Sequence, residues 1–283
     1  VLASYLPDFY AGAREELAQR YGHTPGTTQV EVFRSWEDFS VRSTGFQGYP
    51  ALGVCFGPVV TAVSPLSELR GTFSWARTSF HEFTHVIHLG LSNNRCPRWI
   101  TEGLATWEEG ARNPAWWRNM RRELLDARAN AELIPLRKLN NAFRGPRVLF
   151  AYYQSGLLCQ MLIERHGFPP MVRLLEAFDR GADLDQAFEE VFRAAPDAID
   201  ADFRTFVDAR LAGLSIEPRW SPAGTFRRRF QLARKPPEEA LARRAWAEEW
   251  CKVAWGSHLQ AKKLDAEEAL RLAATAGELP ARG

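Results

Sequence analysis

The residues of this chain best suited to chemistry are two histidines and two glutamates. His81, Glu82 and His85 form the pattern H-E-x-x-H, and Glu102 follows His85 after sixteen intervening residues. In a helix, residues four apart lie on one face, so both imidazoles can bind one metal ion. Glu102 would complete three protein ligands for Zn2+ and leave the fourth position to water. Glu82 would be the general base that takes a proton from that water, which is the chemistry of hydrolysis.

The residues that flank the motif favour a metal site over a pair of solvated histidines. A bare H-E-x-x-H also occurs by chance on exposed amphipathic helices. Here the flanking residues are largely apolar: Ser79, Phe80, Phe83, Val86, Ile87 and Leu89. They predict a helix over residues 72–89 that ends at Gly90 and is buried around its histidines. Burying two imidazoles and a carboxylate without a partner is costly, so we expect a metal ion between them.

Two further polar residues are expected near these histidines. Glu109 lies seven residues after Glu102, on the same helical face, and could accept a hydrogen bond from a ligand histidine. The alternative is a solvated surface acid beside Glu108. His88 shares a face with His85, but three histidines along one straight helix cannot readily surround one ion. We therefore expect His88 to be a partly buried neighbour of the cleft.

The two motifs together resemble the gluzincin zinc peptidases, whose third ligand is a glutamate on a later helix. The resemblance is closest to the bacterial peptidase MA-like domains and more distant to thermolysin and the aminopeptidase N group. In these enzymes the later helix reads approximately W-x-x-E-G-x-A, which Trp99, Glu102, Gly103 and Ala105 match. The resemblance implies a zinc metallopeptidase that uses the three ligands and the base named above.

The resemblance also implies a tyrosine that helps to stabilise the tetrahedral intermediate. In aminopeptidase N relatives this tyrosine starts a later helix, with a leucine ten residues on and a glycine fifteen on. Tyr152 fits this register with Leu162 and Gly167, and Tyr153 is the other candidate. A phenol there would donate to the oxygen on which negative charge develops. Two aromatic side chains packing at the start of a helix would explain the same residues without chemistry.

Strand-forming residues precede the H-E-x-x-H motif. Gly53, Val54 and Cys55 lie in a stretch of β-branched and aromatic residues punctuated by Gly and Pro. In relatives this place holds the edge strand of the substrate cleft, to which a peptide can add by backbone hydrogen bonds. The G-x-M-E-N segment with which aminopeptidase N relatives hold a free amino group has no counterpart here. Exopeptidase specificity is therefore not implied, and cleavage within a chain stays open.

The pattern of predicted elements indicates an α+β fold. A small N-terminal mixed sheet with helices is followed from residue 98 by a mostly helical lobe, which resembles the zincin or gluzincin fold with zinc between the lobes. We expect three parts: a catalytic domain over residues 1–214, a basic Pro-containing connector over 215–237, and a helical pair over 238–283. The pair has weak similarity to the start of tetratricopeptide repeats, and capping helices are the alternative.

Composition narrows the classes of function. The chain has 283 residues, 46% of them hydrophobic, and no apolar run reaches the ~20 residues of a membrane-spanning helix. A net charge of +2 is too small to suggest a nucleic-acid partner. The resemblance to zinc peptidases implies a peptide or protein substrate. The rival hypothesis is a catalytically weak or inactive zinc-fold scaffold whose C-terminal helices recruit a protein partner.

Four cysteines show no C-x-x-C spacing and are not expected to bind the metal. They leave the cellular compartment open. We lean to an extracytoplasmic bacterial setting, with any signal segment absent from this chain.

Overall fold

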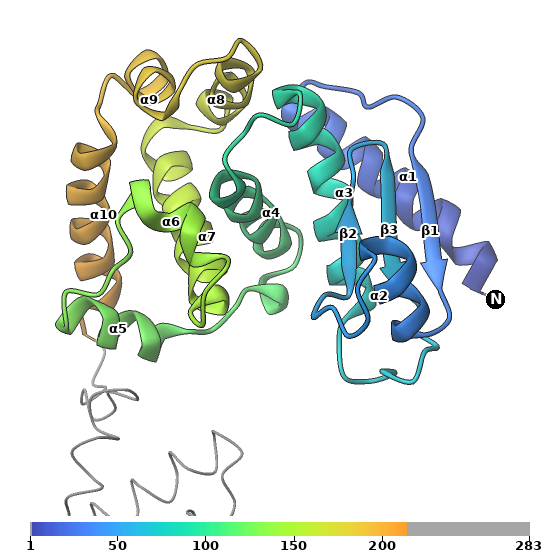
Figure 1. Cartoon of the computed structure of the whole chain (residues 1–283). Coiled ribbons are helices and arrows are strands. Elements are labelled where there is room, and N and C mark those ends of the chain that lie inside the picture. Colours follow the sequence, from blue (N-terminus) through green and yellow to red (C-terminus); the bar gives the residue numbers. More distant parts are fainter. Residues whose placement is uncertain (1, 214–283) are drawn as a thin grey trace, which may run out of the picture. The chain divides into compact units, whose positions relative to one another are not determined.

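A computed structural model describes residues 2–213 as a helical protein with one small sheet (Figure 1). These residues all belong to one compact unit, Val1–Ser215. The strands are β1 (Gln29–Phe33), β2 (Gly53–Cys55) and β3 (Val59–Val63). The helices are α1 (Leu2–Tyr21), α2 (Trp36–Thr44), α3 (Trp75–Ser92), α4 (Arg98–Arg112), α5 (Arg121–Ala129), α6 (Leu136–Ala142), α7 (Val148–His166), α8 (Pro169–Asp179), α9 (Leu184–Phe192) and α10 (Pro196–Leu211), with the 3-10 helix η1 (Pro114–Trp116).

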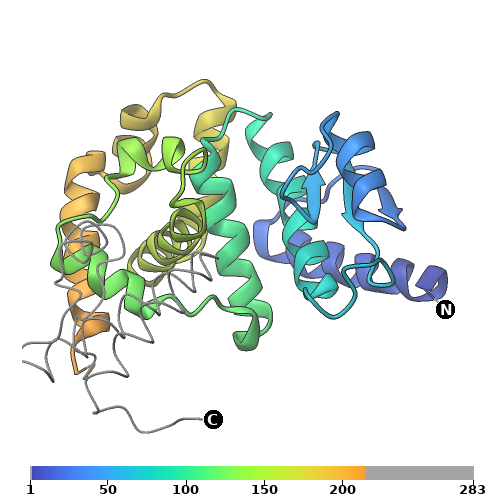
Figure 2. The ribbon, with the colours of Figure 1, turned by 60° about the horizontal axis from the view of Figure 1, so that its bottom comes forward.

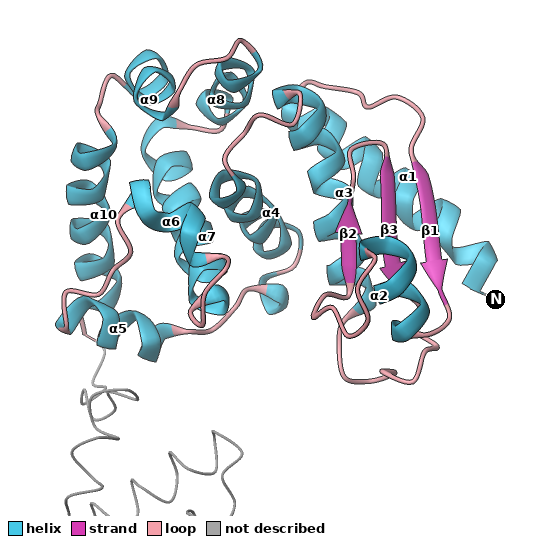
Figure 3. Cartoon of the chain, in the orientation of Figure 1, coloured by secondary structure: helices cyan, strands magenta, loops and turns pink. Residues whose placement is uncertain are grey.

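The expected α+β class is confirmed, because all three strands precede an uninterrupted series of helices (Figure 3). The expected connector over 215–237 and helical pair over 238–283 lie outside the described residues. The three-part division of the chain therefore stays a prediction. Within residues 2–213, no helix combines the length and the apolar character needed to cross a lipid bilayer.

The sheet is mixed, with strand order β1-β3-β2. β1 pairs with β3 in parallel and β2 pairs with β3 antiparallel, so β2 forms one edge. Successive side chains of β3 point to opposite faces of the sheet. Val63 packs with Phe33 of β1 and Phe39 of α2, whereas Val60 lies in the main core with side chains of α1 and α3. Helix α3 thus lies against the sheet, in contact with both β2 and β3 (Figure 1).

Helix α3 (Trp75–Ser92) begins and ends about three residues later than the predicted range 72–89. Ser74 caps its start by accepting a hydrogen bond from the backbone N–H of Arg77. The predicted end at Gly90 is wrong, because the helix runs through Gly90 and ends at Asn93, where φ is +49°. Asparagine adopts this left-handed conformation more readily than most residues, so it can end a helix as glycine does. A Cβ on Gly90 would meet His23 Nε2 at 3.4 Å, an ordinary van der Waals contact, and Gly90 has no positive φ.

Two glycines allow α4 and α7 to pack closely. A Cβ on Gly103 would lie 2.7 Å from the backbone oxygen of Ser155, and a Cβ on Gly156 would lie 2.8 Å from Thr106 Cγ2. Only glycine leaves room for such an approach. Helix α7 runs through the middle of the helical part, against α4, α6, α8 and α10 (Figure 2). The α4–α7 contact thereby fixes where α4 presents its side chains to α3.

Candidate metal centre

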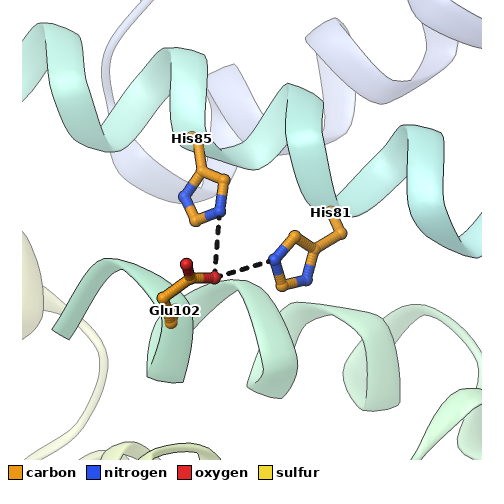
Figure 4. Close-up of side chains that lie close together, drawn as sticks. All are labelled: His81, His85 and Glu102. Atoms are coloured by element: carbon orange, nitrogen blue, oxygen red, sulfur yellow. Dashed lines mark hydrogen bonds and ion pairs between the residues drawn. The ribbon is translucent and has the colours of Figure 1, made fainter. Parts of the chain in front are cut away.

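Two helices bring together three side chains that could hold a metal ion. Helix α3 carries His81 and His85 on one face, and α4 places Glu102 opposite them (Figure 4). Glu102 Oε2 lies 3.1 Å from His81 Nε2 and 3.3 Å from His85 Nε2. The three ligand atoms all lie within 4.8 Å of one another, and all three residues are buried. Within residues 2–213 no other group of three such side chains has this arrangement.

Glu109 fixes the orientation of His81. Its Oε1 accepts a hydrogen bond from His81 Nδ1 at 2.6 Å, about two turns along α4 from Glu102, which meets Nε2 of the same ring. Glu109 is only 2% exposed, so the alternative of a solvated surface acid is wrong. With Nδ1 engaged by Glu109, the other ring nitrogen of His81 is directed toward Glu102 and His85.

The electrostatics of this group favour a cation. Burial by itself lowers the pKa of His81, but the carboxylates of Glu102 and Glu109 outweigh burial and raise that pKa to about 10. Burial also raises the pKa of Glu102, yet hydrogen bonds with His81 and His85 hold it well below its usual value. The Glu102 carboxylate therefore stays ionised at a buried point where positive charge is stabilised.

Glu82 lies beside this group and is held from the side of the sheet. A Cβ on Gly53 would come within 2.5 Å of Glu82 Cγ and 3.1 Å of its Oε1, so the backbone of β2 passes directly against the glutamate. Burial raises the pKa of Glu82, while His81 and His85 counteract part of the shift. A carboxylate whose pKa is raised in this way is well suited to take up a proton.

The expected edge strand is the strand β2, which has β3 as its one partner within the described residues. Val54 pairs with Thr61 and Cys55 with Val60. The Cys55 thiol donates to the backbone oxygen of Gly57 at 3.4 Å. Burial and the nearby Glu82 raise the pKa of Cys55 to about 12, so this thiol stays protonated near neutral pH.

The structure brings Tyr152, and not Tyr153, to the cluster. The Tyr152 hydroxyl donates to Glu102 Oε1 at 3.2 Å. Tyr153 points elsewhere: its ring packs 6.5 Å from that of Phe150, and it lines a separate cavity. Successive residues of a helix are rotated by about 100°, so only one of two neighbouring side chains can face α4.

Sequence reasoning missed two arginines. Arg98 donates from Nε to Glu102 Oε1 at 3.0 Å and from Nη2 to the Tyr152 hydroxyl at 3.4 Å. Its position four residues before Glu102 on a helix was a signal that could have identified it. Arg118, whose Nη2 lies 4.0 Å from Glu109 Oε1, follows the end of α4 and has no such spacing.

His88 takes no part in the cluster. It is fully buried, which corrects the expectation of a partly buried neighbour of the cleft. Its Nε2 shares a 2.7 Å hydrogen bond with the hydroxyl of Tyr21 on α1. Burial, followed by the neighbouring His85 and His81, lowers its pKa well below the usual value. A neutral His88 therefore ties α3 to α1 in the core.

Comparison with known protein families agrees with this geometry. The peptidase MA superfamily matches over residues 52–209, which is more than half of the chain and includes β2, α3, α4 and α7. No curated protein and no solved structure matches. The more distant resemblance to thermolysin and aminopeptidase N therefore stays a prediction. The family match, together with the cluster on α3 and α4, shows that this chain belongs to the peptidase MA superfamily.

Proposed function

We propose that this protein is a zinc-dependent metallopeptidase that hydrolyses peptide bonds. The observation that carries the proposal is the convergence of His81, His85 and Glu102 within 4.8 Å, beside the half-buried Glu82. Membership of a superfamily of peptidases supports the same reaction. Two histidines and one glutamate, with one position left open, are a common ligand set of catalytic zinc.

The separations between these side chains suit zinc. Each bond from zinc to nitrogen or carboxylate oxygen is about 2.0–2.2 Å, so two ligand atoms on a tetrahedral ion lie roughly 3.3–3.5 Å apart. Glu102 Oε2 lies 3.1 Å and 3.3 Å from the two imidazole nitrogens. The hydrogen bond from His81 Nδ1 to Glu109 is typical of a histidine that binds metal through its other nitrogen.

A zinc ion held by this group would supply a Lewis acid that polarises the scissile carbonyl and makes water more acidic. Glu82 accepts the proton of the attacking water and passes it to the departing amine. Its raised pKa favours protonation at this stage, and the backbone at Gly53 limits the positions that its carboxylate can take. No strand of the described residues 2–213 pairs with the outer edge of β2, so an extended peptide could pair there.

Tyr152 is the proposed donor to the oxygen on which negative charge develops. Burial, followed by Glu102, raises the pKa of its phenol above the usual value, so the hydroxyl keeps its proton at neutral pH. The hydroxyl lies 3.2 Å from Glu102 Oε1 and 3.4 Å from Arg98 Nη2, beside the group that would hold the ion. Stabilisation of this kind is commonly worth about 100-fold or more in rate.

The test compares the full-length protein with its Glu82→Gln variant, which keeps the size of the side chain but removes the base. Zinc content is measured by elemental analysis, and hydrolysis is measured with a peptide library, with and without chelator. We expect cleavage by the wild-type protein, loss on chelation, recovery on adding zinc, and a zinc-loaded but inactive variant. Full turnover by Glu82→Gln would contradict the role of Glu82. A zinc-loaded wild-type protein that cleaves nothing would favour the scaffold hypothesis.

A further inference from the structure

A second cavity, of about 360 Å3, lies among η1, α5, α7 and α10. Its lining combines three arginines with aromatic and aliphatic side chains and includes no acidic residue. The lining includes Arg118, Arg121, Arg210, Trp117, Tyr153 and Leu157. Three guanidinium groups around one cavity repel one another, and an anion bound between them relieves that repulsion.

Two of these arginines, Arg121 and Arg210, have no carboxylate partner within residues 2–213, and the third has only a distant one. Arg210 donates to the neutral amide of Gln160 at 2.9 Å. Arg118 comes no closer to a carboxylate than the 4.0 Å that separates it from Glu109. Within residues 2–213, Arg121 and Arg210 form no ion pair. Arginine forms its strongest hydrogen bonds with carboxylate or phosphate, so these side chains can still make such contacts.

The walls of the cavity are pre-formed. A Cβ on Gly110 would lie 2.3 Å from Trp117 Cε3, so the indole ring rests directly on the backbone of α4. Helix α5 begins at Arg121, one of the lining residues, and no side chain caps its start. A rigid aromatic wall beside fixed cations suits a ligand that joins an anionic group to an apolar body.

Arg118 connects this cavity to the metal centre. Its guanidinium lies 5.0 Å from the centre of the Tyr152 ring, which is itself 6.2 Å from the ring of His81. An extended peptide advances about 3.3–3.6 Å per residue, so three to four residues cover this path. One peptide could therefore have its scissile bond at the metal centre and a residue three to four positions before or after that bond in the cavity.

We propose that the cavity binds a carboxylate carried on an apolar body, and that it selects peptide substrates bearing a carboxylate within three or four residues of the scissile bond. The second part rests on the proposed peptidase function. The carboxylate is either the C-terminal group of the peptide or an acidic side chain, and both present the same chemistry to the three arginines.

Binding is tested without relying on turnover. The probes are N-acetyl-phenylalanine and its uncharged amide, titrated calorimetrically into the full-length, zinc-loaded Glu82→Gln protein. We expect the acid to bind at least about tenfold more tightly than the amide, because only the carboxylate makes charge-assisted hydrogen bonds with the arginines. Arg121→Gln and Arg210→Gln should remove this difference. Arg144→Gln, which removes one exposed positive charge outside the cavity, should retain it.

Substrate selection is tested with matched peptides. One pair differs by a free or amidated C-terminus, and another by Glu or Gln near the cleaved bond. For the wild-type protein, we expect kcat/KM to be at least about tenfold higher for the charged peptide than for the uncharged peptide in one of the pairs, because KM is lower. The pair that shows this difference identifies the source of the carboxylate. Arg121→Gln and Arg210→Gln should bring the ratio near one.

The two proposals fail in different ways. Equal binding of acid and amide, or a preference unchanged in both arginine variants, would overturn the assignment of the cavity while leaving hydrolysis intact. Selective binding of the acid by a protein that cleaves no peptide would overturn the peptidase proposal and with it the substrate selection, and would uphold the cavity as an anion site.

Discussion

Replacing Gly53 by alanine tests whether β2 sets the position of the proposed base. The added Cβ would lie 2.5 Å from Glu82 Cγ and 3.1 Å from its Oε1. Carbon atoms in ordinary contact are about 3.5–4.0 Å apart, so one of the two groups must move by roughly 1 Å. The backbone at residue 53 does not have the positive φ that disfavours alanine, so the effect comes from this contact alone.

The side chain of Glu82 is the group that should move. β2 is held by its ladder with β3, whereas a glutamate side chain changes position by rotation about single bonds. Displacement of a catalytic group by about 1 Å can lower activity about 100-fold, which corresponds to about 2.7 kcal/mol in the barrier. We expect kcat/KM of Gly53→Ala to fall by this amount with zinc content unchanged, because Glu82 is not among the proposed ligands.

The assay combines three measurements on the full-length protein. They are kcat and KM with one peptide taken from the library, zinc content, and thermal unfolding. The matched control is Gly26→Ala, since Gly26 is exposed, has no atom within 4 Å of an added Cβ and has no positive φ. The control should keep kcat/KM within about twofold, as surface substitutions usually change little.

Two results would refute this reasoning about Gly53. Unchanged kcat/KM in Gly53→Ala would show that the contact does not restrain Glu82. Loss of zinc together with activity would show that β2 supports the metal centre as a whole, and not the base in particular.

Three further predictions concern α4. Glu109→Gln removes the charge that accepts from His81 Nδ1, so zinc affinity in a chelator competition should fall about 10–100-fold, and unchanged affinity would contradict the role of Glu109. Burial raises the pKa of Glu108 to about 7, so its carboxyl keeps a proton in the folded state at pH values where the unfolded chain has lost it. The free energy of unfolding should therefore fall by about 3 kcal/mol as the pH rises from about 4.5 to 7. Urea unfolding of Glu108→Gln should show no such fall. Gly103→Ala places a Cβ 2.7 Å from the backbone oxygen of Ser155, and urea unfolding should report a loss of about 1–3 kcal/mol; no loss would mean that α4 and α7 separate freely.

Local geometry explains how much of the site could be predicted. The spacing of His81 and His85 on one helical face follows from the pitch of an α-helix, whatever the rest of the fold does. Glu109 could be predicted for the same reason, since it repeats along one face of the helix that carries Glu102. The α+β class also followed from local patterns, because strand-like and helical segments occupy separate parts of the sequence.

The sequence did not determine the exact end of a helix or which of two neighbouring side chains faces a partner helix. Gly90 was a plausible helix end, but Asn93 ends α3, since either residue can adopt the left-handed conformation. The register with Leu162 and Gly167 favoured Tyr152 over Tyr153, but only the placement of α7 shows that the Tyr152 phenol meets Glu102.

The amino-acid sequence by itself determined which residues can take part in the chemistry and which of them share a helical face, because both depend on interactions within a few residues. Only the tertiary structure decided what lies between the helices. It set the 3.1 Å and 3.3 Å approaches of Glu102 to the two histidines, the contact of Gly53 with Glu82, and the gathering of Arg118, Arg121 and Arg210 around one cavity. These contacts join segments far apart in the chain, and their geometry follows from how whole helices and strands pack.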